Sequence, residues 1–382
     1  MRIALFLTGF GAFLNLNATQ PLLPLFRDLF HASELQVSLT VSAAALGVAL
    51  AAPLAGFCAD RLGRKPVIVV AMLGVALATG LAATAFTLNQ LIGWRFLQGI
   101  WVPGIAAVAM AYVSEEAPAG AVGQTMATYV TGTVLGGFFG RFLNGLIAPV
   151  LGWRIAFVWL GLLTVLSACL TAWRLPPSTR FVREGTRGTP LGAFRAHLHN
   201  RQLLATYAVG GSVLLSLTAT FTYVNFYLAD PPFHLGPAAL AMVFGVYLIG
   251  AAVTPLAGRL IDRLGFRRAL LLALATGAVG ILVTLAPSLW AVLAGLTCLA
   301  SGVFACQAAA SSQVGLAAGH ARSSAAGLYV SIYYLGGALG SVIPGFFWAA
   351  TGWPGCVACV LLVQAFSALI AYRYWKKDEG TW

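Results

Sequence analysis

The stretch GFCADRLGRK at residues 56–65 is the first dense cluster of charged residues in a chain that is otherwise almost entirely apolar. The segments PLAG at 53–56 and DRLG at 60–63 return as PLAG at 255–258 and DRLG at 262–265. The spacing between the copies is constant at 202 positions. A charged loop that occurs twice in an apolar chain predicts a duplicated membrane protein.

The composition supports an integral membrane protein. Charged residues make up 8% of the chain and hydrophobic residues 60%, with a mean hydropathy of +0.88. A soluble domain carries about 25% charged residues. Long apolar runs at 67–86 and 270–285 do not fit the short alternating segments of a membrane β-barrel. The sequence therefore predicts an all-α fold.

Apolar runs broken by charge, Pro and Gly predict twelve transmembrane helices, since about 20 apolar residues span a bilayer. The expected ranges are 3–26, 35–58, 67–86, 89–113, 121–147, 154–173, 202–229, 237–258, 268–286, 288–315, 323–348 and 353–374. The polar segment 174–201 is expected to be a cytoplasmic linker. It would separate an N-terminal six-helix bundle at 1–173 from a C-terminal six-helix bundle at 202–382.

A second repeat relates the two halves at an offset of 200 positions. The residues of the first copy are Tyr129, Leu135, Gly136, Gly137, Gly140, Gly145 and Trp153, and those of the second are Tyr329, Leu335, Gly336, Gly337, Gly340, Gly345 and Trp353. Two parallel, pseudo-symmetric repeats are typical of transporters whose substrate site lies between the halves near the bilayer midplane. A duplicated scaffold without a transport path is the alternative.

The net charge of +12 indicates membrane orientation rather than nucleic-acid binding, because cytoplasmic loops collect Lys and Arg. With both termini cytoplasmic, all 22 Lys and Arg residues except Arg27, Arg95, Arg141 and Arg154 fall on the cytoplasmic side. The apolar start lacks a convincing cleavage site, so we expect the first span to be retained. The predicted location is a bacterial inner (plasma) membrane.

Three motifs carry a resemblance to the major facilitator superfamily. The residues Gly56, Asp60, Arg61, Gly63, Arg64 and Lys65 resemble its signature loop between the second and third helices. The pattern Leu91-x3-Arg95-x2-Gln98-Gly99 resembles the helix-four signature of its proton-coupled members. The pattern at Gly132, Gly136, Gly137, Gly140 and Arg141 resembles the helix-five motif of its drug and proton antiporters. Here Gly137 replaces a Pro of that motif and Arg141 replaces a Gly.

With QPLLP at residues 20–24, the chain looks closest to the inner-membrane drug and sugar efflux branch, whose members are proton antiporters. The resemblance covers all twelve spans and implies the major facilitator fold.

The signature loop is a candidate gate. Arg61, Arg64 and Lys65 can neutralise Asp60, and Arg64 can pair with Glu115 or Glu116. The resemblance implies that Asp60 meets the start of the eleventh helix, after 322–324, and that these contacts exist only when the cytoplasmic side is shut. A simple positive-inside anchor is the alternative. The repeated loop contributes Gly258, Asp262, Arg263 and Gly265, but Phe266 replaces the cation at Arg64, which predicts a weaker gate.

Arg95, Gln98 and Arg141 are candidates for proton coupling, since the resemblance implies that role for the arginine of the helix-four signature. An ionisable side chain within a span is costly, so function is the default hypothesis for both arginines. Snorkelling of either arginine to the outer surface is the alternative. The small residues Gly132, Gly136, Gly137, Gly140, Gly336, Gly337 and Gly340 predict two packing seams that could rock, with fixed packing as the alternative.

Polar residues in the spans are candidates for the cavity lining. They are Asn15, Asn17, Gln20, Tyr223, Asn225, Tyr329 and Tyr333. Hydrogen bonding between helices is the alternative for about half of them. All ten acidic residues fall in loops or at expected helix ends, so the cavity should suit a neutral or anionic solute better than a cation.

These features favour a secondary active transporter that moves a small organic solute by alternating access, with efflux coupled to proton uptake. An uptake symporter or uniporter and a non-transporting membrane receptor are the alternatives. We expect a monomer in the lipid bilayer that uses the proton gradient and binds no metal, cofactor or nucleic acid. No HExxH or GxxxxGK[ST] motif is present, so an enzyme is not expected.

Overall fold

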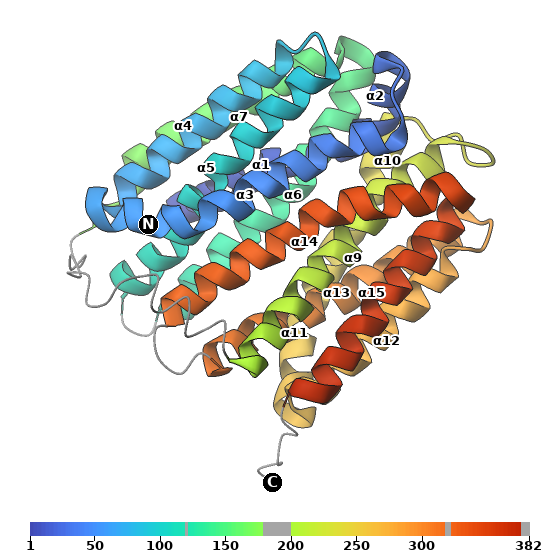
Figure 1. Ribbon diagram of the computed structural model, residues 1–382. Helices are drawn as coiled ribbons and strands as arrows, with labels where there is room; N and C mark the ends of the chain where they lie inside the picture. The colour runs from blue at the N-terminus through green and yellow to red at the C-terminus, as the bar shows by residue number, and fades with distance from the viewer. Residues whose placement is uncertain (119–120, 179–199, 318–321, 376–382) are drawn as a thin grey trace. The chain divides into compact units, whose positions relative to one another are not determined.

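The computed structural model describes residues 1–118, 121–178, 200–317 and 322–375, and all regular structure in them is helical (Figure 1). The helices form two compact units, Met1–Arg187 with Leu235–Phe244, and Gly188–His234 with Gly245–Trp382. The all-α class predicted from the sequence is confirmed. Most of the predicted linker, residues 179–199, lies outside the described residues, so the linker stays a prediction.

The first unit contains α1 (Arg2–Leu16), η1 (Gln20–Leu22), α2 (Leu23–Phe30), α3 (Glu34–Leu62), α4 (Arg64–Ala83), α5 (Leu88–Glu116), α6 (Val122–Leu151), α7 (Trp153–Arg174) and α10 (Pro237–Val243). The second contains α9 (Arg201–Ala229), α11 (Val246–Leu264), α12 (Phe266–Val283), α13 (Leu289–Ala317), α14 (Arg322–Thr351) and α15 (Trp353–Tyr374).

Ten helices in the described residues are long and apolar enough to cross a membrane, and a pair bent by 45° within 237–264 would make an eleventh. Two of the twelve expected helix ranges are interrupted in the structure. The expected helix 3–26 ends at Leu16 and resumes as a short 3-10 turn, because Pro21 lacks an N–H group and polar residues precede it. The expected helix 237–258 is interrupted after Val243, where Gly245 follows.

The duplication extends to the backbone. Gly63 and Gly265 have φ of 89° and 77°, and Gly152 and Gly352 have φ of 89° and 68°. Each of these glycines ends one helix and begins the next, in a region of φ that other residues rarely adopt. Corresponding loops of the two halves therefore both turn at a glycine with positive φ, and ψ also matches at Gly63 and Gly265 but differs between Gly152 (150°) and Gly352 (-141°).

Both predicted glycine seams are close helix contacts inside a single unit. A Cβ atom at Gly132, Gly136 or Gly140 of α6 would collide with a backbone carbonyl of α1. A Cβ atom at Gly336 or Gly340 of α14 would collide with the backbone of α9. Close packing is confirmed at these five glycines but not at Gly137, where a Cβ atom would meet only Arg141 Nη1 at 3.5 Å. Rocking stays a prediction.

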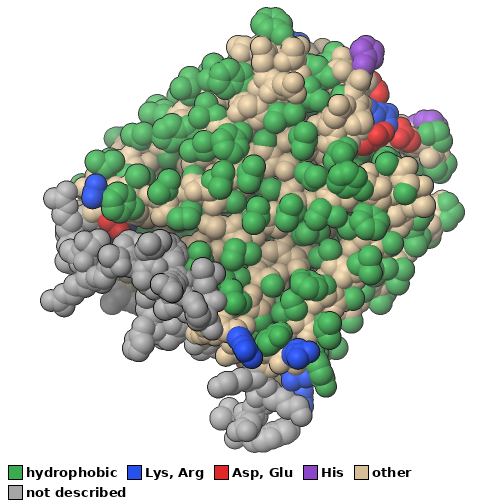
Figure 2. Space-filling view, viewed as in Figure 1, with side chains coloured by type: hydrophobic (Ala, Val, Ile, Leu, Met, Phe, Trp, Pro, Cys, Tyr) green, Lys and Arg blue, Asp and Glu red, His purple; other side chains and the backbone are tan. Residues whose placement is uncertain are grey.

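The described surface is largely apolar, and its charged side chains lie near helix ends. On the face in Figure 2, hydrophobic side chains cover much of the described surface and the charged side chains lie towards its margins. Exposed residues include Leu77, Val150 and Trp290. An outer surface rich in large apolar side chains is expected of helices that contact lipid.

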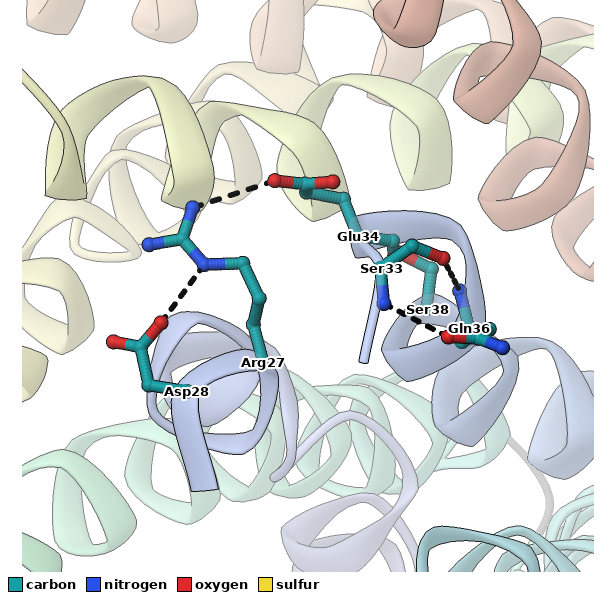
Figure 3. Close-up of polar contacts among 6 residues, drawn as sticks. All are labelled: Arg27, Asp28, Ser33, Glu34, Gln36 and Ser38. Atoms are coloured by element: carbon teal, nitrogen blue, oxygen red, sulfur yellow. Dashed lines mark hydrogen bonds and ion pairs between the residues drawn. The ribbon is translucent and has the colours of Figure 1, made fainter. Parts of the chain in front are cut away.

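The turn between α2 and α3 shows how charge is arranged at one such end (Figure 3). Arg27 pairs with Asp28 at 3.0 Å and with Glu34 at 3.4 Å. Ser33 and Gln36 form a reciprocal capping box, which satisfies two backbone N–H groups and fixes the start of α3 at Glu34.

Candidate functional site

A buried arginine holds the end of α1 where the first span breaks. Arg95 of α5 is fully buried, and its guanidinium donates to the carbonyl of Asn15 at 2.8 Å and to that of Leu16. Its Nε donates to the carbonyl of Thr40 at 3.1 Å. The last carbonyls of a helix lack partners within it, and a cation there is favourable. Arg95 therefore caps α1, and the snorkelling alternative is wrong.

An amide and hydroxyl network extends this cap across four helices. Gln98 accepts a hydrogen bond from Arg95 and donates to Thr79 Oγ1 at 2.5 Å. Thr79 Oγ1 lies 3.0 Å from Asn15 Oδ1, and Asn15 Nδ2 donates to Thr164 Oγ1 at 2.8 Å. Asn15 is thus an interhelical hydrogen-bonding residue, and its prediction as cavity lining is wrong.

The downstream side of the break is held by α6. Arg141 is buried, and it donates to Gln20 Oε1 at 2.8 Å and to the Gly137 carbonyl at 2.6 Å. Its guanidinium lies over the Phe244 ring, 4.6 Å from the centroid. Arg141 therefore does not snorkel, and Gln20 is packed against it rather than lining a cavity.

Asn144 of α6 also holds the segment after α1, because its Nδ2 donates to the carbonyl of Ala18 at 2.8 Å. Sequence reasoning missed Asn144, Thr79 and Thr164, although each is a polar residue within an apolar span and could have been singled out for that reason. Asn17, which ends α1, is only half-buried and keeps its place as a candidate.

The first signature loop forms the predicted ion pairs. Arg64 Nη1 lies 2.7 Å from Asp60 Oδ1, and Arg64 binds both carboxylate oxygens of Glu115, at 2.7 and 3.1 Å. The Arg64 side chain is only 10% exposed, so this two-pronged pair is more shielded than an ordinary surface pair. Arg61 lies over the Phe57 ring at 4.1 Å.

These pairs connect α3, α4 and α5 inside one unit. The prediction that the Arg64 contacts form only when the cytoplasmic side is shut does not follow for a contact within a unit. The side chains at 322–324, which Asp60 is expected to meet, lie outside the described residues. The gating role of the loop therefore stays a prediction, and it now rests on the expected contact of Asp60 alone.

The repeated loop is built differently. Asp262 and Arg263 are exposed, and among residues whose side chains are described neither forms an ion pair. Phe266 begins α12 where Arg64 begins α4. Gly56 and Gly258 lie within α3 and α11, and a Cβ atom at either would meet no atom within 4 Å. In this arrangement neither position requires glycine.

In the second unit, two cavity candidates are packing residues. Tyr223 donates to the Ser341 carbonyl at 3.0 Å, and Asn225 donates to the Phe221 carbonyl at 2.6 Å. Tyr329 and Tyr333 stack with their centroids 5.8 Å apart. The buried Tyr329 hydroxyl has no hydrogen-bond partner in the described part of the chain, so this tyrosine pair remains a candidate for contacting solute.

The sequence profile of the Major Facilitator Superfamily matches residues 5–231 and 226–381. The chain belongs to this superfamily. It is 31% identical to the inner membrane transport protein YnfM of Escherichia coli over 97% of this chain and 89% of that protein. The superfamily assignment makes it a multi-pass membrane transporter, as the sequence predicted.

Two further comparisons extend this result. A segment covering 42% of this major facilitator chain, and 42% of its relative, is 32% identical to the multi-drug resistance efflux pump PmrA of Streptococcus pneumoniae. The fold matches the crystal structure of a bacterial homologue of the human lysosomal transporter Spinster, with a TM-score of 0.80 and 17% identity. That match covers 100% of this chain and 98% of the other.

Proposed function

We propose that this major facilitator protein exports a small organic solute in exchange for protons, by alternating access. The single observation that carries the proposal is the buried Arg95, which links the break in α1 to α3 and α5. A cation buried within a span is costly and is retained where it works. Efflux is supported by the likeness to PmrA, and proton coupling by the helix-four signature that contains Arg95 and Gln98.

The solute is proposed to be neutral or anionic. Asp28, Glu34, Asp60, Glu115, Glu116, Asp230 and Asp262, the acidic residues in the described part of the chain, lie at helix ends or beside them. The buried cation Arg95 donates its described hydrogen bonds to three backbone carbonyls and the Gln98 amide, and none of them goes to one of these carboxylates. A protein that buries fixed positive charge without a carboxylate beside it repels cations.

Residence in a bacterial inner membrane with both termini cytoplasmic completes the proposal. The inner-membrane relative YnfM supports the location, and the Lys and Arg distribution supports the orientation. The proton gradient is the proposed energy source, with no bound cofactor.

The test begins with a thermal-shift screen of the purified protein against sugars, amino acids, organic anions and lipophilic drugs. A stabilising solute is then assayed in inside-out vesicles with an acidic interior. Proton-coupled efflux predicts that the solute accumulates inside and that a protonophore abolishes the accumulation. Accumulation driven by an alkaline interior would instead identify an uptake symporter. Movement that ignores the gradient would identify a uniporter.

A further inference from the structure

A small cavity lies in the second unit, where α9, α12, α13 and α15 meet, and polar side chains form part of its lining. Its volume is about 10 Å³, and its polar lining includes Ser212 and Ser216 of α9 together with Gln364 and Ser367 of α15. The sequence analysis did not single out any of these residues. They are distinct from the ion pairs and the tyrosine pair described above.

The cavity is the repeat counterpart of the Arg95 network. Thr164 and Ser167 of α7 correspond to Gln364 and Ser367 of α15 at an offset of 200 positions. On the partner helix, Asn15 of α1 corresponds to Ser216 of α9 at an offset of 201. In the first unit these positions are in contact, because Asn15 Nδ2 donates to Thr164 Oγ1 at 2.8 Å.

The two units fill this position differently. The long Asn15 side chain reaches Thr164 in the first unit, whereas the shorter Ser216 side chain stands at the matching position in the second. Gln364 is 96% buried, and its Oε1 atom has no hydrogen-bond partner among the described residues. A buried polar atom without a partner is unfavourable, and such atoms in native proteins are usually satisfied by ordered water.

We propose that this cavity is a structural hydration site, in which one water molecule hydrogen-bonds the Gln364 amide and replaces the donor that Asn15 supplies in the first unit. The volume of about 10 Å³ matches a single water and excludes an organic solute. Water also suits either orientation of the amide, because it both donates and accepts. The neighbouring serine hydroxyls provide the further polar partners that a buried water needs.

The test compares the full-length protein with Ser216→Asn, which introduces the residue of the first unit. A structure that resolves ordered solvent should show a water about 2.7–3.2 Å from Gln364 Oε1 in the native protein. The Ser216→Asn variant should lack this water and donate from Asn to Gln364, raising the melting temperature by about 2 °C. Ser311→Asn on the exposed face of α13 is the matched control, and it should change neither the ordered water at Gln364 nor the melting temperature.

Gln364→Leu keeps the proposal testable if Ser216→Asn does not fold. This variant removes the amide without filling the position of Ser216, and it should lose the water while the protein still unfolds at the native temperature or above. The proposal would be overturned by a native structure with no solvent at Gln364. It would also be overturned if the water persisted unchanged in Gln364→Leu.

Discussion

Arg95 donates to three backbone carbonyls and one side-chain amide, and none of these acceptors carries a charge. A buried cation without a counter-ion keeps its charge only where several dipoles replace its hydration. The end of α1 supplies such dipoles, because its final carbonyls are unsatisfied within the helix. The cation and the helix break therefore stabilise each other.

Arg95→Met should destabilise the protein by about 2 kcal/mol, because it removes the hydrogen bonds from Arg95 to the buried carbonyls of Asn15 and Leu16 at the end of α1. Arg95→Lys should recover part of this loss, since an ammonium cannot reach all four acceptors at once. Arg154→Met is the control, because Arg154 is exposed and has a single carbonyl partner at Ala85. Thermal unfolding in detergent measures the difference. Equal melting temperatures for Arg95→Met and Arg154→Met would contradict the capping role.

The ion pairs at Arg64 lead to a second prediction. Glu115→Gln should cost about 1 kcal/mol, because it removes a two-pronged pair with a mostly shielded guanidinium. A double-mutant cycle with Arg64→Met isolates the pair and should give a coupling energy of similar size. A coupling energy indistinguishable from zero would show that the ion pair does not stabilise the folded protein.

For individual residues, the sequence predicted side-chain partners best where both partners are charged. Arg64 could be paired in advance with Glu115 or Glu116, because few other charges are available in an apolar chain. The partners of Asn15 could not, since Thr79 and Thr164 are 64 and 149 positions away and many hydroxyl residues compete for that role. Hydrogen bonds between helices depend on helix rotation, which hydropathy does not specify.

Among the helices, α1 differs most from the sequence-based expectation. An apolar run predicted one helix over 3–26, but the chain forms α1, η1 and α2. The run concealed the break because polar groups at residues 15–20 hydrogen-bond to buried side chains of the same unit, namely Arg95 of α5 and Arg141 and Asn144 of α6. Discontinuous spans often mark functional regions in transporters.

The seam between α1 and α6 can be tested with two glycines of the same helix. A Cβ atom at Gly140 would overlap the Leu14 carbonyl, whereas one at Gly137 would meet only Arg141 Nη1 at 3.5 Å. Gly140→Ala should therefore force α1 and α6 apart and lower the melting temperature by several degrees. Gly137→Ala should be neutral or raise it, because Ala favours helix by up to about 1 kcal/mol. Expression yield and thermal unfolding measure both, and tolerance of Gly140→Ala would contradict the packing.

Across the whole molecule, the duplication explains most of what the sequence could predict. Low charge content, apolar runs and two offsets near 200 residues were enough for the helical class, and three motifs that resemble those of the superfamily were enough for the family. The solute site could not be predicted as well, because most of the predicted lining residues are engaged in packing within a unit. Polar residues in a span serve both purposes, and composition alone does not separate them.

The two halves repeat the signature-loop glycines but not the ion pairs beside them, which predicts unequal loops. Asp60→Asn should reduce transport several-fold, because Asp60 belongs to an ion-paired cluster that connects helices of its unit. Asp262→Asn should change transport less than two-fold, since Asp262 is exposed and forms no ion pair with residues whose side chains are described. Initial rates of solute flux in matched proteoliposomes compare each variant with the native protein. Equal effects of the two substitutions would contradict the asymmetry.

The most direct test of proton-coupled efflux reverses the coupling, since antiport makes each gradient drive the other. Proteoliposomes loaded with the stabilising solute are diluted into solute-free buffer, and a trapped pH-sensitive dye reports the lumen. Outward solute movement by an antiporter must carry protons inward, so the lumen should acidify, and Arg95→Met should abolish the signal. An unchanged lumen pH during measured solute release, or an alkaline shift, would contradict proton-coupled efflux.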